Sequence, residues 1–255
     1  MNNIGNDISK YIGLSGWSYP GWEEKFYHQK LNGLEQLRFY GTQFNTVEIN
    51  YSFYHIPKAQ TFTAWASVVP KDFRFSVKLH RMFTHDNYLI LTDDLPIKLK
   101  TFLDHAGAMG EKFAALLVQT PKSLPYDLER LRLFLQQLSK VTKALLYTPR
   151  VVFEFRNEQW LQQTTYDVLE EFKAGLVISQ SSRYPIAKEA TSNILYFRFH
   201  GPEKMFDSSY TETQLSEHKK FIDGHTSVKD FFAYFNNTMH GQAIDDARKF
   251  KSILG

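Results

Sequence analysis

RVVFEFR (150–156) is a run of apolar residues with charged side chains at its C-terminal end, and three other segments repeat the pattern: NTVEIN (45–50), FRFSVK (73–78) and LYFRFHG (195–201). Phe, Val and Ile dominate these segments, which is typical of strands covered on both faces. A charge inside a dry strand is costly unless it is paired. Because the charges recur at the same end of each segment, we expect a polar site at the C-terminal mouth of a parallel β/α barrel.

The alternation of side chains along each segment supports this interpretation, because successive residues of a strand face opposite sides of the sheet. In 195–200, the leucine and both phenylalanines share one face, whereas Tyr196, Arg198 and His200 share the other. The corresponding polar faces of the other segments carry Glu48 and Asn50, Lys78, and Glu154 and Arg156. We predict that the apolar faces pack under helices and that the polar faces point into the barrel lumen.

The order of elements along the chain favours the same fold. Strands are predicted at 11–16, 45–50, 73–78, 113–119, 150–156, 175–180, 194–200 and 230–236, and helices near 33–43, 58–69, 96–109, 127–140, 162–173, 212–222 and 241–253. This alternation predicts an α/β protein with a single closed (β/α)8 barrel of TIM type. The alternative is an open doubly wound sheet, which usually has a Gly-rich turn after its first strand. Here that turn is SGWSYPGW (15–22), which is too aromatic to cradle a phosphate.

Length and composition fit one domain of this kind. The chain has 255 residues, of which 43% are hydrophobic, so we expect one domain over 1–255 with a polar extension over 1–10. The net charge of +3 comes from dispersed Lys and Arg, a pattern that does not indicate nucleic-acid binding. The absence of Cys excludes disulfides and thiolate nucleophiles. With no signal-like or membrane-spanning segment, we expect a cytoplasmic protein without a membrane partner.

Two inward-facing carboxylates, Glu48 and Glu154, are candidate catalytic groups. As a pair they could serve as acid and base, or they could form ion pairs inside the lumen. A third alternative is a divalent metal site completed by His80, His85 or His200. No HxH or HExxH spacing supports the metal, so no cofactor is expected.

Cations outnumber carboxylates at the predicted mouth, where Lys78, Arg156 and Arg198 are joined by Arg81 and His200. This excess favours a small or extended anionic ligand carrying a phosphate or carboxylate group. His200 is the candidate proton carrier near neutral pH. Long irregular stretches at 17–32, 79–95 and 181–192 follow predicted strands, where a barrel builds its site.

Aromatic and amide side chains complete the candidate site. Ser15 and Trp17 fall at the end of the predicted first strand, and Tyr19 and Trp22 follow in the loop. The two Trp and the Tyr form either a pocket wall or a hydrophobic lid. Neutral hydrogen-bonding groups at the ends of other strands are Asn50, Gln119, Asn236 and Asn237.

Seven motifs in this order resemble one known family: SGWSYPGW (15–22), FNTVEINYSFY (44–54), FRFSVKLHRMFTH (73–85), VQTPKSL (118–124), FEFRNEQW (153–160), YFRFHG (196–201) and YFNNTMHGQAIDDAR (234–248). They are similar to the YecE-like family, the domain of unknown function numbered 72. The resemblance spans nearly the whole chain and implies a β/α barrel, but it supplies no activity. It places the family's recurrent polar positions on Ser15, Trp17, Tyr19, Glu48, Asn50, Lys78, His85, Gln119, Glu154, Arg156, Arg198, His200, Asn236 and Asn237.

Family members often carry an Asp after the sixth strand, where this chain has Gln180 and Ser181. This departure disfavours a scheme that needs a third carboxylate or a hard metal ion. We expect an enzyme with hydrolytic or acid/base chemistry on an anionic substrate. Glu48, Glu154 and His200 would be catalytic, and the other recurrent positions would bind the substrate. The alternative is a non-catalytic module that binds a nucleotide, nucleic acid or protein segment.

Overall fold

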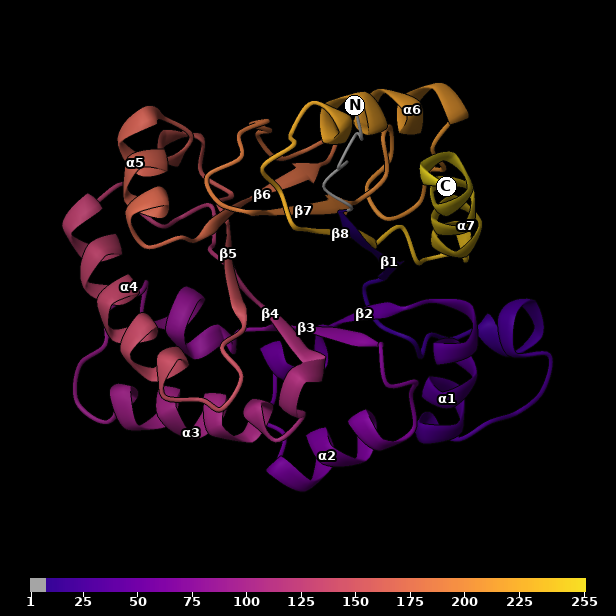
Figure 1. Ribbon diagram of the computed structural model, residues 1–255, viewed down its shortest axis with the longest axis horizontal. Coiled ribbons are helices and arrows are strands. Elements are labelled where there is room, and N and C mark those ends of the chain that lie inside the picture. Colours follow the sequence, from indigo (N-terminus) through magenta and orange to yellow (C-terminus); the bar gives the residue numbers. More distant parts are fainter. Residues whose placement is uncertain (1–7) are drawn as a thin grey trace, which may run out of the picture.

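Eight parallel strands close into a barrel in the computed structural model, which describes residues 8–255 (Figure 1). Each strand pairs with its neighbours in the sequence, and β1 pairs with β8 to complete the ring. This arrangement confirms the predicted fold class and rules out the open doubly wound sheet. Of the polar extension expected over 1–10, residues 1–7 lie outside the described residues, whereas Ser9 and Lys10 belong to β1.

The strands lie close to the predicted ranges. They are β1 Ser9–Leu14, β2 Thr46–Ile49, β3 Arg74–Lys78, β4 Phe113–Gln119, β5 Arg150–Glu154, β6 Gly175–Gln180, β7 Ile194–Phe199 and β8 Asp230–Phe235. The largest difference is in β1, which begins and ends before the predicted 11–16 because Ser9 and Lys10 pair with β8. Ser15 and Gly16 therefore belong to the loop at the mouth.

Helices surround the barrel on its outer side (Figure 1). Within the described residues they are α1 Gly33–Gln43, α2 Ala59–Ser67, α3 Leu95–Gly107, α4 Leu128–Lys143, α5 Gln163–Glu171, α6 Glu212–Asp223 and α7 Gln242–Leu254. Five shorter helical turns lie at Glu23–Tyr27, Tyr51–Phe53, Met82–Asp86, Gly110–Lys112 and Glu158–Trp160. The connection between β6 and β7 has no helix in the described chain, as the sequence pattern indicates. None of the described helices is long and apolar enough to cross a membrane.

Local sequence explains where several helices begin. The Asn32 side chain accepts hydrogen bonds from the first-turn amides of α1, and the Glu35 carboxylate accepts one from the Asn32 amide, which together form a capping box. Thr211 and Gln214 form the same arrangement at α6. These caps satisfy amides that have no partner within the helix, so they fix the points at which the chain turns from loop to helix.

The lumen becomes more polar from the bottom of the barrel to its mouth. Its lower part is apolar and aromatic, with Tyr11 stacked on Phe232. Above it, the Tyr234 hydroxyl lies 2.6 Å from Thr46 Oγ1 and 2.7 Å from Ser76 Oγ, so hydroxyls from three strands satisfy one another. The charged side chains lie nearer the mouth, which agrees with the predicted alternation.

Gly13 lies where β1 and β2 approach each other closely. A Cβ atom there would lie 2.0 Å from the backbone oxygen of Thr46 and 2.8 Å from the Tyr40 hydroxyl. The Tyr40 hydroxyl donates to Thr46 O and accepts from the Leu14 amide, so it bridges the two strands. A side chain at position 13 would have to separate β1 from β2.

We therefore expect Gly13→Ala to lower the free energy of unfolding by about 3 kcal/mol or more, since backbone atoms must move to relieve the overlap. Gly33→Ala is the matched control, because a Cβ there has nothing within 4 Å; it should stay within about 1 kcal/mol of the wild type. Urea unfolding measures both. Equal stability of the two variants would contradict the close approach at β1–β2.

Candidate functional site

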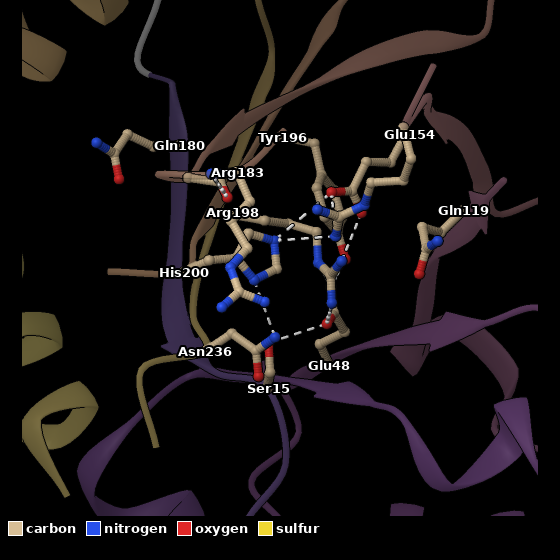
Figure 2. Close-up of polar contacts among 12 residues, drawn as sticks. Ser15, Glu48, Gln119, Glu154, Gln180, Arg183, Tyr196, Arg198, His200 and Asn236 are labelled. Carbon is tan, nitrogen blue, oxygen red and sulfur yellow. Dashed lines mark hydrogen bonds and ion pairs between the residues drawn. The ribbon is translucent and has the colours of Figure 1, made fainter. Parts of the chain in front are cut away.

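Arg198 on β7 lies between two buried carboxylates, as Figure 2 shows. Its Nε and Nη2 donate to Glu48 Oε2 and Oε1 at 3.0 and 2.7 Å, and its Nη1 donates to Glu154 Oε2 at 2.5 Å. The three side chains are at most 2% exposed. One guanidinium thus joins β2, β5 and β7 across the lumen.

Glu48 has its carboxylate fully engaged. Besides both bonds from Arg198, it accepts from Ser15 Oγ at 2.9 Å and from the Tyr196 hydroxyl at 2.8 Å. Burial alone would raise the pKa of Glu48, but the charge and hydrogen bonds of Arg198 outweigh burial and hold this pKa below its usual value. Glu48 is therefore ionised at neutral pH.

Glu154 is also ionised, because it faces two guanidinium groups. Its Oε1 lies 2.7 Å from Arg156 Nη2, and its Oε2 accepts from Arg198. Burial would raise the pKa of Glu154, yet Arg156 and Arg198 together lower it well below its usual value. Arg198 with Glu48 and Glu154 forms what we call the arginine clamp.

His200 lies beside the clamp and is almost fully buried. Its Nδ1 lies 3.1 Å from Asn236 Nδ2, and its Nε2 lies 3.5 Å from Glu154 Oε1 and 3.3 Å from Arg156 Nη2. If Asn236 donates to Nδ1, the ring proton is on Nε2 and faces Glu154. Burial lowers the pKa of His200 to about 4 despite its contact with Glu154, so the imidazole is neutral at pH 7.

Lys78 at the end of β3 has a different environment from the arginines. Its Nζ donates to Gln119 Oε1 at 2.7 Å and lies 4.0 Å from the centre of the Phe53 ring. Within residues 8–255, no carboxylate lies within ion-pair distance of it. Burial, with the nearby charge of Arg198, lowers the pKa of Lys78 to about 7.

A cavity of about 260 Å³ opens above the clamp, and we call it the mouth pocket. Its lining residues come from the C-terminal ends of the seven strands β2 to β8 and the loops that follow them: Asn50, Phe53, Tyr54, Lys78, Gln119, Arg156, Tyr184, Arg198, His200, Met205, Phe206 and Asn236. Arg156 stacks on Tyr184, with its Cζ atom 3.7 Å from the ring centre. Its Nη1 is buried and has no hydrogen-bond partner among the described residues.

Seven of the residues that the sequence predicts for the site line the mouth pocket: Asn50, Lys78, Gln119, Arg156, Arg198, His200 and Asn236. Glu48 and Glu154 do not line it, because the arginine clamp holds them beneath it. Asn237 points elsewhere and donates to Asp246 of α7 and to Ser208 O. His85 lies behind the lining, 2.8 Å from Thr84 Oγ1 and 3.5 Å from Gln119 Nε2. Arg81 pairs with Asp86 at the surface.

The aromatic loop after β1 forms a second cavity, of about 350 Å³, which has mainly apolar walls. Trp17, Tyr19, Tyr51 and Trp65 contribute to it, and Trp17 packs edge-on against Trp65. Ser15 is buried at its base, and Trp22 is buried in the core. Asn50 lines both cavities, and its Oδ1 is buried without a partner in the described chain. The pocket-wall interpretation thus agrees with Trp17 and Tyr19, which line a cavity, and the hydrophobic-cluster interpretation agrees with the buried Trp22.

Sequence reasoning missed the aromatic part of the mouth pocket. Phe53 and Tyr54 follow β2 in a short helical turn, and Tyr184 belongs to the long connection after β6. Such loops carry no periodic pattern that would give the direction of a side chain. The one usable signal was their position, since 181–192 is a long irregular stretch that follows a strand.

A metal site finds no support in the part of the chain that the structure describes. No three His, Asp or Glu side chains converge there as a set of ligands. The candidate ligands Glu48 and Glu154 are instead engaged by arginine. Gln180, at the position where the family resemblance implies an Asp, points away from the cluster around Arg198 in Figure 2. Its Oε1 accepts from the Tyr210 hydroxyl.

These features define a (β/α)8-barrel protein with a polar pocket above a buried arginine–carboxylate cluster. The sequence model of the family described as "Protein of unknown function DUF72" matches residues 11–255, so the chain belongs to this family. The resemblance to the YecE-like family is thereby confirmed.

Two relatives are similar to this chain in sequence, one over nearly the whole chain and one over half of it. The UPF0759 protein YunF of Bacillus subtilis (strain 168) is 26% identical over 281 aligned positions, which cover 96% of this chain and 94% of YunF. The UPF0759 protein YecE of Escherichia coli (strain K12) is 31% identical over 129 positions, which cover 50% of this chain and 44% of YecE.

Solved structures of the same family share the fold. The DUF72 protein TM1631 of Thermotoga maritima is similar with a TM-score of 0.81 and 25% identity, over 96% of this chain and 99% of that protein. The DUF72 protein EF0366 of Enterococcus faecalis has a TM-score of 0.81 and 21% identity, over 96% of this chain and 95% of that one, and it shows the fold alone.

The arginine clamp generates a stability prediction. Arg198→Met leaves Glu48 and part of Glu154 buried without their main partner, so we expect the free energy of unfolding at pH 7 to fall by about 3–5 kcal/mol. Both carboxylates have a pKa that is lowered in the folded state, so the stability they contribute is present above their unfolded pKa and is lost as the pH falls. The difference between wild type and variant should therefore shrink in acid.

Denaturant unfolding between neutral and acid pH measures this difference. The control is Arg150→Met, which breaks the exposed 3.3 Å pair with Asp230 and should cost no more than about 1 kcal/mol. Similar losses for the two variants at pH 7 would show that the buried clamp has no special role in stability.

Proposed function

We propose that this protein is an enzyme that performs acid/base chemistry on a small anionic substrate bound in the mouth pocket. The observation that carries the proposal is the pair of cations in the pocket wall that lack a full set of partners. Arg156 Nη1 is buried without a hydrogen-bond partner in the described chain, and Lys78 contacts only a neutral amide and an aromatic ring. Buried donors of this kind are normally satisfied, so they favour an acceptor supplied by a ligand.

The charge balance of the site supports an anion. Glu48 and Glu154 together carry two negative charges, and Arg156, Arg198 and Lys78 carry three positive charges when Lys78 is protonated. Both carboxylates face guanidinium groups, so the excess positive charge lies at Lys78 and at the unpaired Nη1 edge of Arg156. A planar guanidinium edge suits a carboxylate or phosphate oxygen.

The titration behaviour of the pocket supports proton transfer. At pH 7 His200 is a neutral imidazole, and Lys78, whose pKa is about 7, is present in both its charged and neutral forms. Efficient general acids and bases have a pKa near the working pH. The lining of the pocket thus offers Lys78 as a group that can give or take a proton, and His200 as a neutral ring in the same cavity.

A hydrolytic scheme with Glu48 and Glu154 as acid and base has less support. A general acid must be protonated at the working pH, but both carboxylates have a lowered pKa. They also lie below the pocket, with Glu48 accepting four hydrogen bonds. We assign them to the support of Arg198 and Arg156, and we place acid/base chemistry at Lys78 and His200.

Sulfate binding tests this proposal, because sulfate keeps two negative charges across the useful pH range. Compared with chloride at equal ionic strength, sulfate at a hundredfold excess over its dissociation constant should stabilise the protein by about 2.7 kcal/mol. The increment should fall as the pH rises from about 6 to about 8, because Lys78 loses its charge as the pH passes its pKa. The charged groups that influence Lys78 are Arg198, Glu154, Glu48 and Arg156. Burial and the charge of Lys78 lower the pKa of the neighbouring His85 to about 4, so His85 is neutral over this range.

Two variants and one control localise the effect in thermal unfolding. Arg156→Met should abolish the increment, and Lys78→Met should remove most of its pH dependence. Lys219→Met changes an exposed lysine paired with Asp223 and should leave the increment unchanged. Equal midpoints in sulfate and chloride, or a full increment in Arg156→Met, would refute the anion pocket.

A further inference from the structure

Lys78 combines a position in the mouth pocket with an environment that suits a neutral amine. Its Nζ has a neutral acceptor, Gln119 Oε1, at 2.7 Å and the face of Phe53 at 4.0 Å. The arginine clamp binds both nearby carboxylates, so within residues 8–255 none is within ion-pair distance of Lys78. A lysine held among cations and an aromatic ring loses its proton readily.

A second feature of the pocket would position a substrate for attack by this amine. Arg156 is held in place by Glu154 Oε1 at 2.7 Å and by the Tyr184 ring, and its buried Nη1 has no hydrogen-bond partner among the described residues. Arg156 and Lys78 line the same cavity of about 260 Å³. An anionic group on Nη1 would hold the rest of a small molecule inside this cavity with Lys78.

We propose that Nζ of Lys78 forms an imine with the carbonyl carbon of a substrate whose carboxylate or phosphate group binds Arg156 Nη1. This inference rests on the anion pocket proposed above and names its substrate class, a small aldehyde or ketone that carries an anionic group. Lysines in apolar or cationic surroundings are suited to this chemistry, because only the neutral amine is nucleophilic. The pKa of Lys78, about 7, makes the neutral form abundant at physiological pH.

The step balances without an oxidant or reductant. The lone pair of Nζ forms a bond to the carbonyl carbon, and the π electrons move to the carbonyl oxygen. One proton leaves the nitrogen and one reaches that oxygen, which gives a carbinolamine. The C–O bond then breaks, the oxygen leaves as water with the second amine proton, and a C=N bond remains. His200 lines the same pocket as a neutral imidazole and is the group placed to relay these protons.

Reductive trapping tests the inference on the wild-type protein. The protein is incubated with pyruvate and cyanoborohydride at neutral pH, so that reduction converts any imine into a stable secondary amine, and the modified lysines are located by peptide mass spectrometry. Lys78 should react at least about tenfold faster than exposed lysines such as Lys219. At pH 7 about half of the Lys78 side chains are neutral, whereas the neutral fraction of an ordinary lysine is on the order of one in a thousand. Acetone, which lacks the carboxylate, is the matched uncharged probe.

Further comparisons identify which anionic group the pocket prefers, a carboxylate or a phosphate, and test the role of Arg156. Dihydroxyacetone phosphate replaces pyruvate to compare a phosphate with a carboxylate, and faster labelling of Lys78 by one of the two identifies the preferred group. Sulfate should protect Lys78 from both probes. Arg156→Met should slow labelling by pyruvate about tenfold or more, the loss expected for one charge-assisted contact, and should leave labelling by acetone unchanged.

The outcomes distinguish this inference from the function on which it rests. Labelling spread evenly over the lysines would overturn the imine, and if sulfate still stabilises the protein through Arg156, the anion pocket stands. Equal labelling of Lys78 by pyruvate and acetone would overturn the anchoring role of Arg156. Loss of both the sulfate effect and selective labelling would overturn the inference and the proposed function together.

Discussion

The guanidinium of Arg198 lies between the carboxylates of Glu48 and Glu154, and the rest of the site depends on this contact. All three charges are buried, which a lumen tolerates only when they compensate one another. The clamp joins three strands and separates the apolar lower lumen from the mouth pocket. Arg198 engages both carboxylates, so Lys78 has no carboxylate partner among the described residues. Arg156 contacts Glu154 through Oε1. Burial, together with the positive charge of Arg198 in the clamp, thus lowers the pKa of Lys78.

The fold could be predicted from the sequence because successive side chains of a strand alternate between the two faces of the sheet, with a period of two residues. Every strand places its alternate residues in the lumen, so the inward positions of Arg198, His200 and Lys78 followed from the pattern alone. The position of a side chain along the barrel axis could not be predicted. It depends on how far each strand is shifted against its neighbours, and this shift puts Glu48 and Glu154 beside Arg198 instead of in the pocket. Loop residues such as Tyr184 carry no periodic signal and were missed.

The mouth pocket brings together two requirements that usually oppose each other. An anion favours charged groups, whereas a nucleophilic amine must lose its charge. Here the permanent charge belongs to Arg156, whose edge is held by Glu154 and Tyr184, and the variable charge belongs to Lys78. Beside it, the aromatic cavity shares its lining residue Asn50 with the mouth pocket. This division of roles between arginine and lysine would allow the proposed anion binding and acid/base chemistry to occupy the same small volume.

The titration of the Lys78 side chain is the measurement that tests this account most directly. Protein labelled with ¹³C and ¹⁵N at lysine allows the Lys78 signal to be followed by NMR against pH, with Lys78→Arg as the assignment control. The account predicts a midpoint of about 7 in chloride, far below the usual 10.5, and a higher midpoint in sulfate because the bound anion stabilises the ammonium form. A midpoint near 10.5 that does not change with sulfate would contradict it.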